Sequence, residues 1–367
     1  MTDMDYKSRK NLVEEAREYA AFSRRSLLTG AGVLAGASLL GKNFIQTASA
    51  DEVKKPKDGK KYKIGIPLNY GPFNQPWRRG CGDLVQAVLD AGCEPVTVRG
   101  EPTKASEQEA ERTLLDRGID VLVMGIYSLE SETAAIADEA KKRGIPTVGF
   151  AVSVKDSPSV VEDTWATGAT LGYYVHNALG RKGSIVQTAE DKGFYSPFDM
   201  EADMLDLMTK WEPRMKMLPF MPGSVSTNDQ ISKGRDNVLA LLQANPAPGA
   251  VSGIVSWWWP LILGAGQALK QQNRTDVRLF NHYFSDQLLT DMAAKTFPIE
   301  FSTDVPWHTI GKKTGELAVS IARGEKVENK QYRVPVTAIV QEEAAKALVE
   351  VQAMDKKAIA LLGKYGG

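Results

Sequence analysis

The most constraining feature of the sequence is a regular alternation of short apolar segments with longer amphipathic ones, which begins at Tyr62. Apolar segments at 62–68, 95–98, 121–124 and 146–150 are separated by segments whose apolar residues recur at helical spacing. Short apolar strands that alternate with helices of about a dozen residues are typical of a parallel sheet covered by helices on both faces. The first part of the chain therefore predicts a doubly wound α/β lobe.

The alternation restarts at Ser184, which predicts a second lobe of the same kind. We predict an α/β fold of two doubly wound parallel-sheet lobes, joined by a hinge of three crossings near 152–160, 303–306 and 330–335. The N-terminal lobe is expected to hold residues 60–154 and 305–332. The C-terminal lobe is expected to hold residues 158–303 and 335–367, with a C-terminal helical extension packed outside it.

The first 50 residues have the order of an export signal. Arg24 and Arg25 form a twin-arginine pattern, an uncharged Gly-rich stretch covers 26–41, and a small-residue cleavage site ends at Ala50. The apolar stretch is shorter than the roughly 20 residues that span a membrane. We predict that residues 1–50 are a twin-arginine signal peptide and that the chain is soluble in the periplasm after cleavage near Ala50.

The charge balance argues against a nucleic-acid partner, and the cysteine spacing argues against a disulfide. The chain has 45 basic and 45 acidic residues, whereas nucleic-acid binding needs a basic surface, so no nucleic-acid partner is expected. Cys81 and Cys93 flank one predicted helix, which separates them by about 18 Å. A disulfide needs Cα atoms within about 7 Å, so both cysteines are expected to be packing residues.

No catalytic or metal-binding motif stands out in the sequence. The histidines His176, His282 and His308 have no second histidine or carboxylate beside them at metal-ligand spacing. The sequence contains no C-x-x-C, no H-E-x-x-H and no G-x-S-x-G. We therefore predict a protein that is not an enzyme and that has no cofactor and no metal.

Several segments together resemble a known family: 64–66 with 74–80, 115–122, 143–148 and 322–326. On these segments the chain resembles the type I periplasmic binding proteins, of the ribose- and galactose-binding kind, which serve ATP-driven importers. Three positions depart from the sugar binders of that family. Phe150-Ala151 stands where they have Asp-Arg, Trp257-Trp258-Trp259 where they have Asn-Asp, and Tyr283 where they have Asp.

A narrower resemblance is to the periplasmic receptors that sense trimethylamine N-oxide and signal through a membrane histidine kinase. Those receptors enclose their ligand in aromatic rings. Trp77, Trp165 and Tyr283 match the ring-bearing positions.

Tryptophan and tyrosine gather in the loops that follow the predicted strands, where open parallel sheets bind their ligands. Core packing is the alternative role for each tryptophan, although three consecutive tryptophans cannot all face one core. We predict a ligand site of five rings and three polar side chains: Trp77, Trp165, Trp257, Trp258, Tyr283, Asn74, Asp163 and Asp304.

The family resemblance implies a receptor that closes on a sugar or polyol and delivers it to the membrane permease of an ABC importer. Rings stack on the C–H faces of sugars, but they also hold methylated ammonium groups by cation–π attraction, worth about 0.5–2 kcal/mol per ring. The alternative is therefore a sensor of trimethylamine N-oxide or another methylated amine, with a histidine kinase as the membrane partner.

Overall fold

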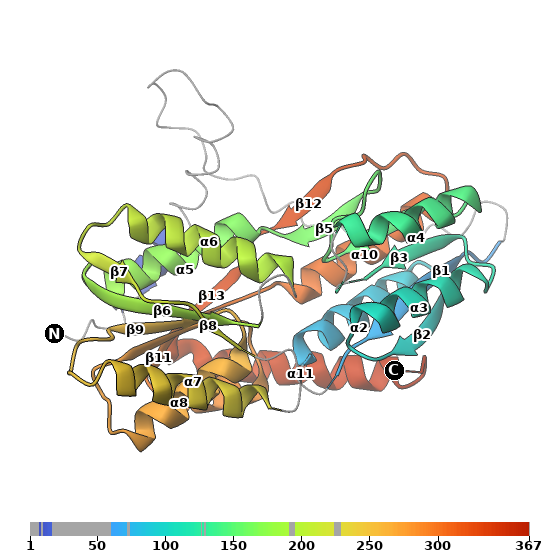
Figure 1. Ribbon diagram of the computed structural model, residues 1–367. Coiled ribbons are helices and arrows are strands. Elements are labelled where there is room, and N and C mark those ends of the chain that lie inside the picture. Colours follow the sequence, from blue (N-terminus) through green and yellow to red (C-terminus); the bar gives the residue numbers. More distant parts are fainter. Residues whose placement is uncertain are drawn as a thin grey trace, which may run out of the picture.

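The chain forms two α/β lobes that lie side by side in the computed structural model (Figure 1). The structure describes residues 7–8, 10–16, 60–71, 74–125, 127, 130–190, 195–223 and 229–366. The predicted twin-arginine pair and the cleavage site near Ala50 lie outside these residues. Within the described part of the chain, no helix is both long enough and apolar enough to cross a membrane.

The N-terminal lobe is built on a six-stranded sheet with the order β12-β5-β4-β3-β1-β2, in which every strand pairing is parallel. Its strands are β1 (Lys63–Asn69), β2 (Glu94–Gly100), β3 (Val121–Met124), β4 (Thr147–Phe150), β5 (Ser159–Glu162) and β12 (Gln331–Val334). Its helices are α2 (Gln75–Asp90), α3 (Lys104–Leu115), α4 (Glu130–Lys142) and α10 (Trp307–Ala322).

Strand β3 shows why this sheet must be covered on both faces. All four of its residues are apolar and buried. Val121 and Val123 belong to the apolar cluster that includes α2 and α10, and Leu122 and Met124 belong to a separate cluster with α3 and α4. Because side chains alternate along a strand, the continuous apolar run supplies both clusters.

The C-terminal lobe contains a seven-stranded sheet with the path β13-β11-β10-β9-β6-β7, and β8 also pairs with β6. Its strands are β6 (Gly183–Ala189), β7 (Met215–Met217), β8 (Met221–Pro222), β9 (Gly253–Ser256), β10 (Arg278–His282), β11 (Ile299–Asp304) and β13 (Thr337–Val340). Its helices are α5 (Thr164–Ala178), α6 (Ser196–Lys210), α7 (Gln230–Ala244), α8 (Trp259–Gln271), α9 (Asp286–Ala293) and the 3-10 turn η1 (Gln341–Glu343). Only the edge strand β13 pairs antiparallel among the described strands.

Sheet membership places three crossings between the lobes: at Asp163 between β5 and α5, at 305–306 between β11 and α10, and at 335–336 between β12 and β13. The first crossing lies a few residues later than the sequence predicts. The reason is β5, which continues the N-terminal sheet by pairing with β4 and β12 before the chain leaves that lobe.

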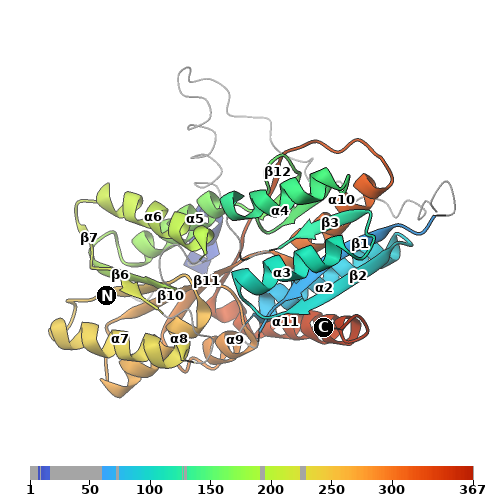
Figure 2. The same cartoon turned by 45° about the vertical axis from the view of Figure 1, so that its right-hand side comes forward.

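Helix α11 (Ala344–Leu362) runs beneath both lobes in Figures 1 and 2. Its buried residues recur every three or four positions, as expected for a helix with one apolar face: Ala344, Ala347, Val351, Asp355, Ala358 and Leu362. This face packs against α9 of the C-terminal lobe and also against α2 of the N-terminal lobe. The sequence predicts packing outside the C-terminal lobe, and the contact with α2 adds the N-terminal lobe.

The contact between α11 and α2 is close and specific. Arg78 Nη2 lies 3.0 Å from Asp355 Oδ2 in a pair that is largely buried. A Cβ atom added to Gly82 would lie 2.7 Å from Cβ of Ala358, so only glycine permits this approach of the two helices.

Cys81 and Cys93 are both free and buried, as the sequence predicted. Burial raises the pKa of the Cys81 thiol to about 12. Since the thiolate is the reactive form, Cys81 is a packing residue and not a nucleophile.

Candidate ligand-binding site

Eight aromatic rings from both lobes form a continuous set of contacts, which we name the ring cluster. The N-terminal lobe supplies its rings from the ends of β3 and β4 and the first turns of α2 and α10: Trp77, Tyr127, Phe150 and Trp307. The C-terminal lobe supplies its rings from the start of α6 and the ends of β9 and β10: Tyr195, Phe198, Trp258 and Tyr283. All eight rings follow strand ends or begin helices, as expected for a site between doubly wound lobes.

The ring cluster connects the two lobes directly. Trp77 and Trp258 stack with their ring centroids 6.1 Å apart and their planes inclined by 24°. Trp77 also lies 6.1 Å from Tyr195, and Tyr283 lies 6.4 Å from Trp307. The lobes are therefore in a closed arrangement, with rings of one lobe against rings of the other.

Three of the five rings predicted from the sequence, Trp77, Trp258 and Tyr283, lie in the ring cluster. Trp257 is fully buried and its Nε1 donates a hydrogen bond to Gln187 Oε1 at 2.7 Å. Trp165 packs with an apolar group on α5 and α6. None of the ring contacts found among the described residues joins Trp165 to the ring cluster.

The three predicted polar residues are buried at structural junctions. Asn74 Oδ1 accepts a hydrogen bond from the backbone N–H of Gly71 at 2.9 Å. Asp163 lies at the first crossing. Asp304 ends β11 at the second crossing, and its Oδ1 accepts a hydrogen bond from the backbone N–H of Phe284 at 2.8 Å.

Asp304 is also the partner of a buried arginine. Its Oδ2 lies 3.8 Å from Nη2 of Arg79, which reaches it from α2. Burial raises the pKa of the Asp304 carboxyl to about 6, while Arg79 and the N–H of Phe284 act in the opposite direction. This contact ties the second crossing to the N-terminal lobe.

The backbone at Tyr283 adopts a left-handed conformation, with φ of 78°. Such values are uncommon for a bulky residue and tend to occur at functional sites. The conformation is held by a 2.8 Å hydrogen bond from the Tyr283 N–H to the carbonyl of Thr303. It turns the chain as β10 ends and places the ring of Tyr283 against Trp258, with centroids 5.2 Å apart.

Five rings of the cluster are not among the predicted site residues: Tyr127, Phe150, Tyr195, Phe198 and Trp307. Four of them lie in or at the end of a strand-end segment, so the same rule that selected Tyr283 could have selected them. Phe198 lies inside the first turn of α6, where its helical position gives no separate signal.

One group of described side chains could hold a metal ion, although the sequence predicted none. Glu162, Glu201 and His282 are all buried, and one potential ligand atom from each lies within 4.8 Å of the others. They come from β5, α6 and β10, so no local spacing in the sequence could reveal them.

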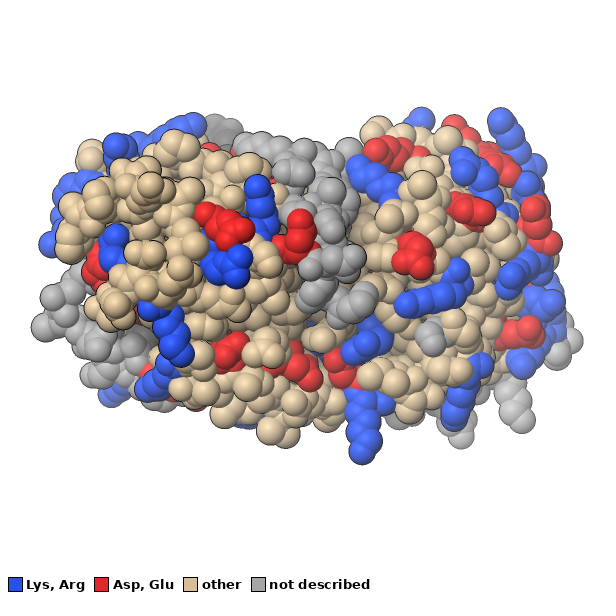
Figure 3. Space-filling view, turned by 60° about the horizontal axis from the view of Figure 1, so that its bottom comes forward, with Lys and Arg blue, Asp and Glu red and all other residues tan. Residues whose placement is uncertain are grey.

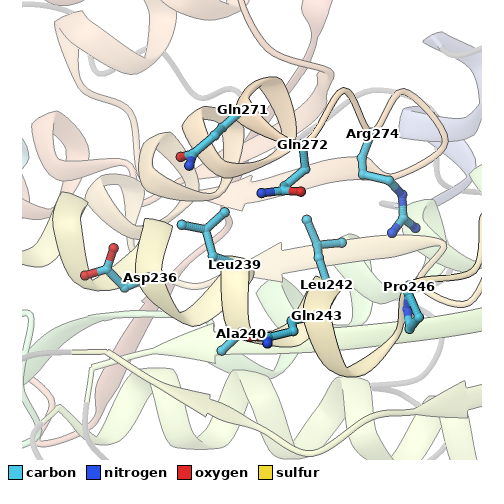
Figure 4. A pocket seen from close by; sticks show the side chains of 9 residues that line it. All are labelled: Asp236, Leu239, Ala240, Leu242, Gln243, Pro246, Gln271, Gln272 and Arg274. Atoms are coloured by element: carbon cyan, nitrogen blue, oxygen red, sulfur yellow. The ribbon is translucent and has the colours of Figure 1, made fainter.

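Two surface features lie away from the ring cluster. A cavity of about 710 Å³ lies between the C-terminal parts of α7 and α8, with residues such as Leu239, Gln243 and Arg274 around it (Figure 4). It has no aromatic lining, and Arg274 there is already paired with Asp276. On the face seen in Figure 3, basic and acidic side chains are interspersed.

Comparison with known proteins identifies the family of the chain. The family profile described as "Periplasmic binding protein domain" matches residues 66–326. A search of curated protein sequences gives no significant match.

Solved structures with the same fold cover most of the chain. An ABC transporter solute binding protein from Agrobacterium vitis with bound allitol has a TM-score of 0.70 and 21% identity, covering 79% of this chain and 99% of that one. An ABC sugar transporter subunit from Rhodobacter sphaeroides has a TM-score of 0.67 and 18% identity, with coverage of 77% and 98%. A 5-methylthioribose transporter solute binding protein from Thermotoga lettingae has a TM-score of 0.67 and 15% identity, with coverage of 85% and 95%.

The fold and the matching family profile define a two-lobed solute-binding protein of type I. The chain belongs to the periplasmic binding protein family. Proteins of this family bind solutes and are not enzymes, so the chain is a periplasmic binding protein and not an enzyme.

Proposed function

We propose that this chain is a periplasmic receptor that closes on a small sugar or polyol within the ring cluster and delivers it to the membrane permease of an ABC importer. The observation that carries the proposal is a set of buried polar atoms on the rings. Nε1 of Trp77, Nε1 of Trp307 and the hydroxyl of Tyr127 are buried and have no hydrogen-bond partner among the described residues.

An indole N–H can only donate a hydrogen bond, so a ligand that satisfies Trp77 and Trp307 must offer acceptor atoms. Hydroxyl oxygens of a sugar or polyol are acceptors, and they can also receive or donate at the Tyr127 hydroxyl. The ring faces can stack on the C–H faces of the same ligand. Leaving such groups unpaired in a buried site costs about 1–3 kcal/mol each, which favours a ligand that pairs them.

The related structures support this ligand class. The Agrobacterium vitis protein is described with bound allitol, and the Thermotoga lettingae protein with 5-methylthioribose. Both are described as solute-binding proteins of transporters, which supports the importer as the membrane partner.

The second candidate is a sensor of trimethylamine N-oxide or another methylated amine, which signals through a membrane histidine kinase. The specific observation in its favour is the range of ring orientations around Trp77, which meets Tyr127 at 87°, Trp307 at 68° and Trp258 at 24°. Rings set at such different angles suit a compact methylated group, and an N-oxide oxygen can accept one of the indole N–H bonds.

Ligand screening separates the two candidates. Thermal denaturation of the purified protein is measured with allitol and other polyols, with pentoses and hexoses, and with betaine and trimethylamine N-oxide. A ligand present at a hundred times its dissociation constant should stabilise the fold by about 2.7 kcal/mol. Stabilisation by polyols or sugars supports the proposal, whereas stabilisation by methylated amines alone supports the second candidate.

The variant Trp77→Phe tests the role of the indole N–H, because it keeps an aromatic face and removes the donor. Loss of one hydrogen bond should raise the dissociation constant by about 2- to 12-fold. Trp211→Phe is the matched control, since Trp211 is 69% exposed on the surface. Equal affinities of Trp77→Phe and the unchanged protein for a polyol would contradict the proposed pairing.

A further inference from the structure

Three ionisable side chains from distant parts of the sequence meet beside the ring cluster. Glu162 ends β5, Glu201 lies in α6, and His282 ends β10 and directly precedes Tyr283. Glu201 and His282 are both 0% exposed, and Glu162 is buried. His282 Nε2 lies 3.4 Å from Glu162 Oε1 and 3.7 Å from Glu201 Oε1.

The hydrogen bonds of Glu162, Glu201 and His282 leave several of their buried polar atoms without a partner. Thr167 donates to Glu162 Oε1 at 2.5 Å, and His282 Nδ1 lies 2.8 Å from the hydroxyl of Thr303. Glu162 Oε2, both oxygens of Glu201 and His282 Nε2 have no hydrogen-bond partner among the described residues. His282 Nδ1 and the Thr303 hydroxyl share one hydrogen bond, which leaves Nε2 of His282 facing the two carboxyl groups.

A buried carboxylate without a donor or a cation is costly, and here two carboxylates share one interior site. A divalent cation would balance both negative charges at once.

The distances from His282 Nε2 to the two carboxylate oxygens are compatible with Zn²⁺. Zn²⁺ binds histidine nitrogen and carboxylate oxygen at about 2.0–2.2 Å in tetrahedral geometry, which sets neighbouring ligand atoms about 3.3–3.6 Å apart. The two distances from His282 Nε2 agree with this range to about 0.1 Å. The Thr303 hydroxyl is the kind of second partner that orients a metal-binding imidazole.

We propose that Glu162, Glu201 and His282 bind one Zn²⁺ ion in the interior of the protein, next to the ring cluster and close to the first crossing between the lobes. Three protein ligands leave one tetrahedral position for water or for a group of the cleft ligand. The site joins β5 of the N-terminal lobe to α6 and β10 of the C-terminal lobe, so the ion ties the lobes together.

The test is a zinc titration of the purified full-length protein after treatment with a chelator, followed by calorimetry and thermal denaturation. One equivalent of Zn²⁺ is expected to bind and to raise the melting temperature. Glu201→Gln keeps the shape of the side chain and removes its charge, and should lower zinc affinity by at least about 100-fold. Thr303→Val should lower it by about 10- to 100-fold, as expected for a residue that orients a ligand.

His308→Gln is the matched control. His308 is exposed and lies 2.9 Å from Asp83, so it could capture zinc at the surface. Zinc affinity lost in His308→Gln, retained in Glu201→Gln, or absent from the unchanged protein overturns the proposal. The proposal is also overturned if an organic amine stabilises the protein, zinc does not, and the stabilisation by the amine is lost in Glu201→Gln.

Two measurements keep the test independent of folding and of the cleft ligand. Glu201→Gln without metal should melt at or above the temperature of the metal-free unchanged protein, because it replaces a buried carboxyl group that has no hydrogen-bond partner among the described residues. Trp77→Phe should bind zinc with unchanged affinity, so failure of the sugar or polyol proposal would leave the zinc result intact.

Discussion

Trp257 and Trp258 are neighbours in the chain, yet they have different surroundings. Trp257 lies against His282 and bonds to Gln187 of β6, inside the C-terminal lobe. Trp258 stacks on Trp77 of the other lobe. Trp257 thus has a packing role, whereas its neighbour Trp258 belongs to the ring cluster.

This difference predicts that alanine substitution of Trp257 mainly affects stability and that alanine substitution of Trp258 mainly affects ligand binding. Trp257→Ala should lower the free energy of unfolding by about 3–5 kcal/mol, the usual cost of emptying a large buried site. Trp258→Ala should instead weaken ligand binding more than it weakens the fold. Urea denaturation and calorimetry of both variants check this, and equal losses of stability would show that both rings belong to one core.

His176 predicts a sensitivity to acid. It is buried in α5 with Nε2 3.0 Å from the hydroxyl of Thr209, and burial, reinforced by Arg181, lowers its pKa to about 4. Between about pH 6.5 and pH 4 the unfolded chain binds a proton here and the folded protein does not, so stability is lost as the pH falls.

The expected loss from this residue is about 2–3 kcal/mol between pH 7 and pH 4.5. His176→Gln keeps a hydrogen-bonding side chain and removes the titration. Urea denaturation at both pH values should therefore show a smaller acid loss in the variant, and an identical loss would exclude His176 as its source.

The sequence could predict Trp77, Trp258 and Tyr283 because the strand-end rule needs only the order of local elements. It could not predict the meeting of Glu162, Glu201 and His282. These residues are far apart in the chain, and only the pairing of strands and the packing of α6 bring them together.

At the level of elements, α2 and α10 pack without space for a side chain between them. A Cβ atom on Gly311 would lie 2.0 Å from the carbonyl oxygen of Gly80. Gly311→Ala should therefore destabilise the fold by about 1–3 kcal/mol, as other overpacked substitutions do. Gly363→Ala is the control, because Gly363 has a helical φ of −57° and an added Cβ atom would lie 3.2 Å from its nearest neighbour, the carbonyl oxygen of Ile359.

Thermal and urea denaturation of the two variants provide the measurement. Gly363→Ala should stay within about 1 kcal/mol of the unchanged protein. A Gly311→Ala variant of unchanged stability would mean that α2 and α10 can separate at little cost.

Most elements follow from the alternation of apolar segments, but the strands at the crossings do not. β12 (Gln331–Val334) and β13 (Thr337–Val340) are separated by only two residues but belong to different sheets. β12 pairs with β5, more than 150 residues earlier in the chain, and carries exposed polar residues. Such edge strands are defined by their distant partner and have little pattern of their own.

For the whole molecule, the contacts between rings of opposite lobes correspond to a closed state. With three short crossings as the connection, the ligand-free protein should open about the hinge and the ligand should draw the lobes together. Small-angle scattering should show a smaller radius of gyration with saturating ligand than without it. An unchanged radius would mean that the lobes are fixed.

Helix α11 also affects the equilibrium between the open and closed states. It contacts α2 and α9 on a surface separate from the ring cluster, so its packing contributes to the energy difference between open and closed states. When only a fraction of molecules is competent to bind, the apparent dissociation constant equals the intrinsic one divided by that fraction. Substitutions at the α2–α11 contact can therefore change the apparent affinity by changing the populations of the open and closed states. The residues that contact the solute stay the same, so selection can adjust the affinity of the protein without changing its specificity.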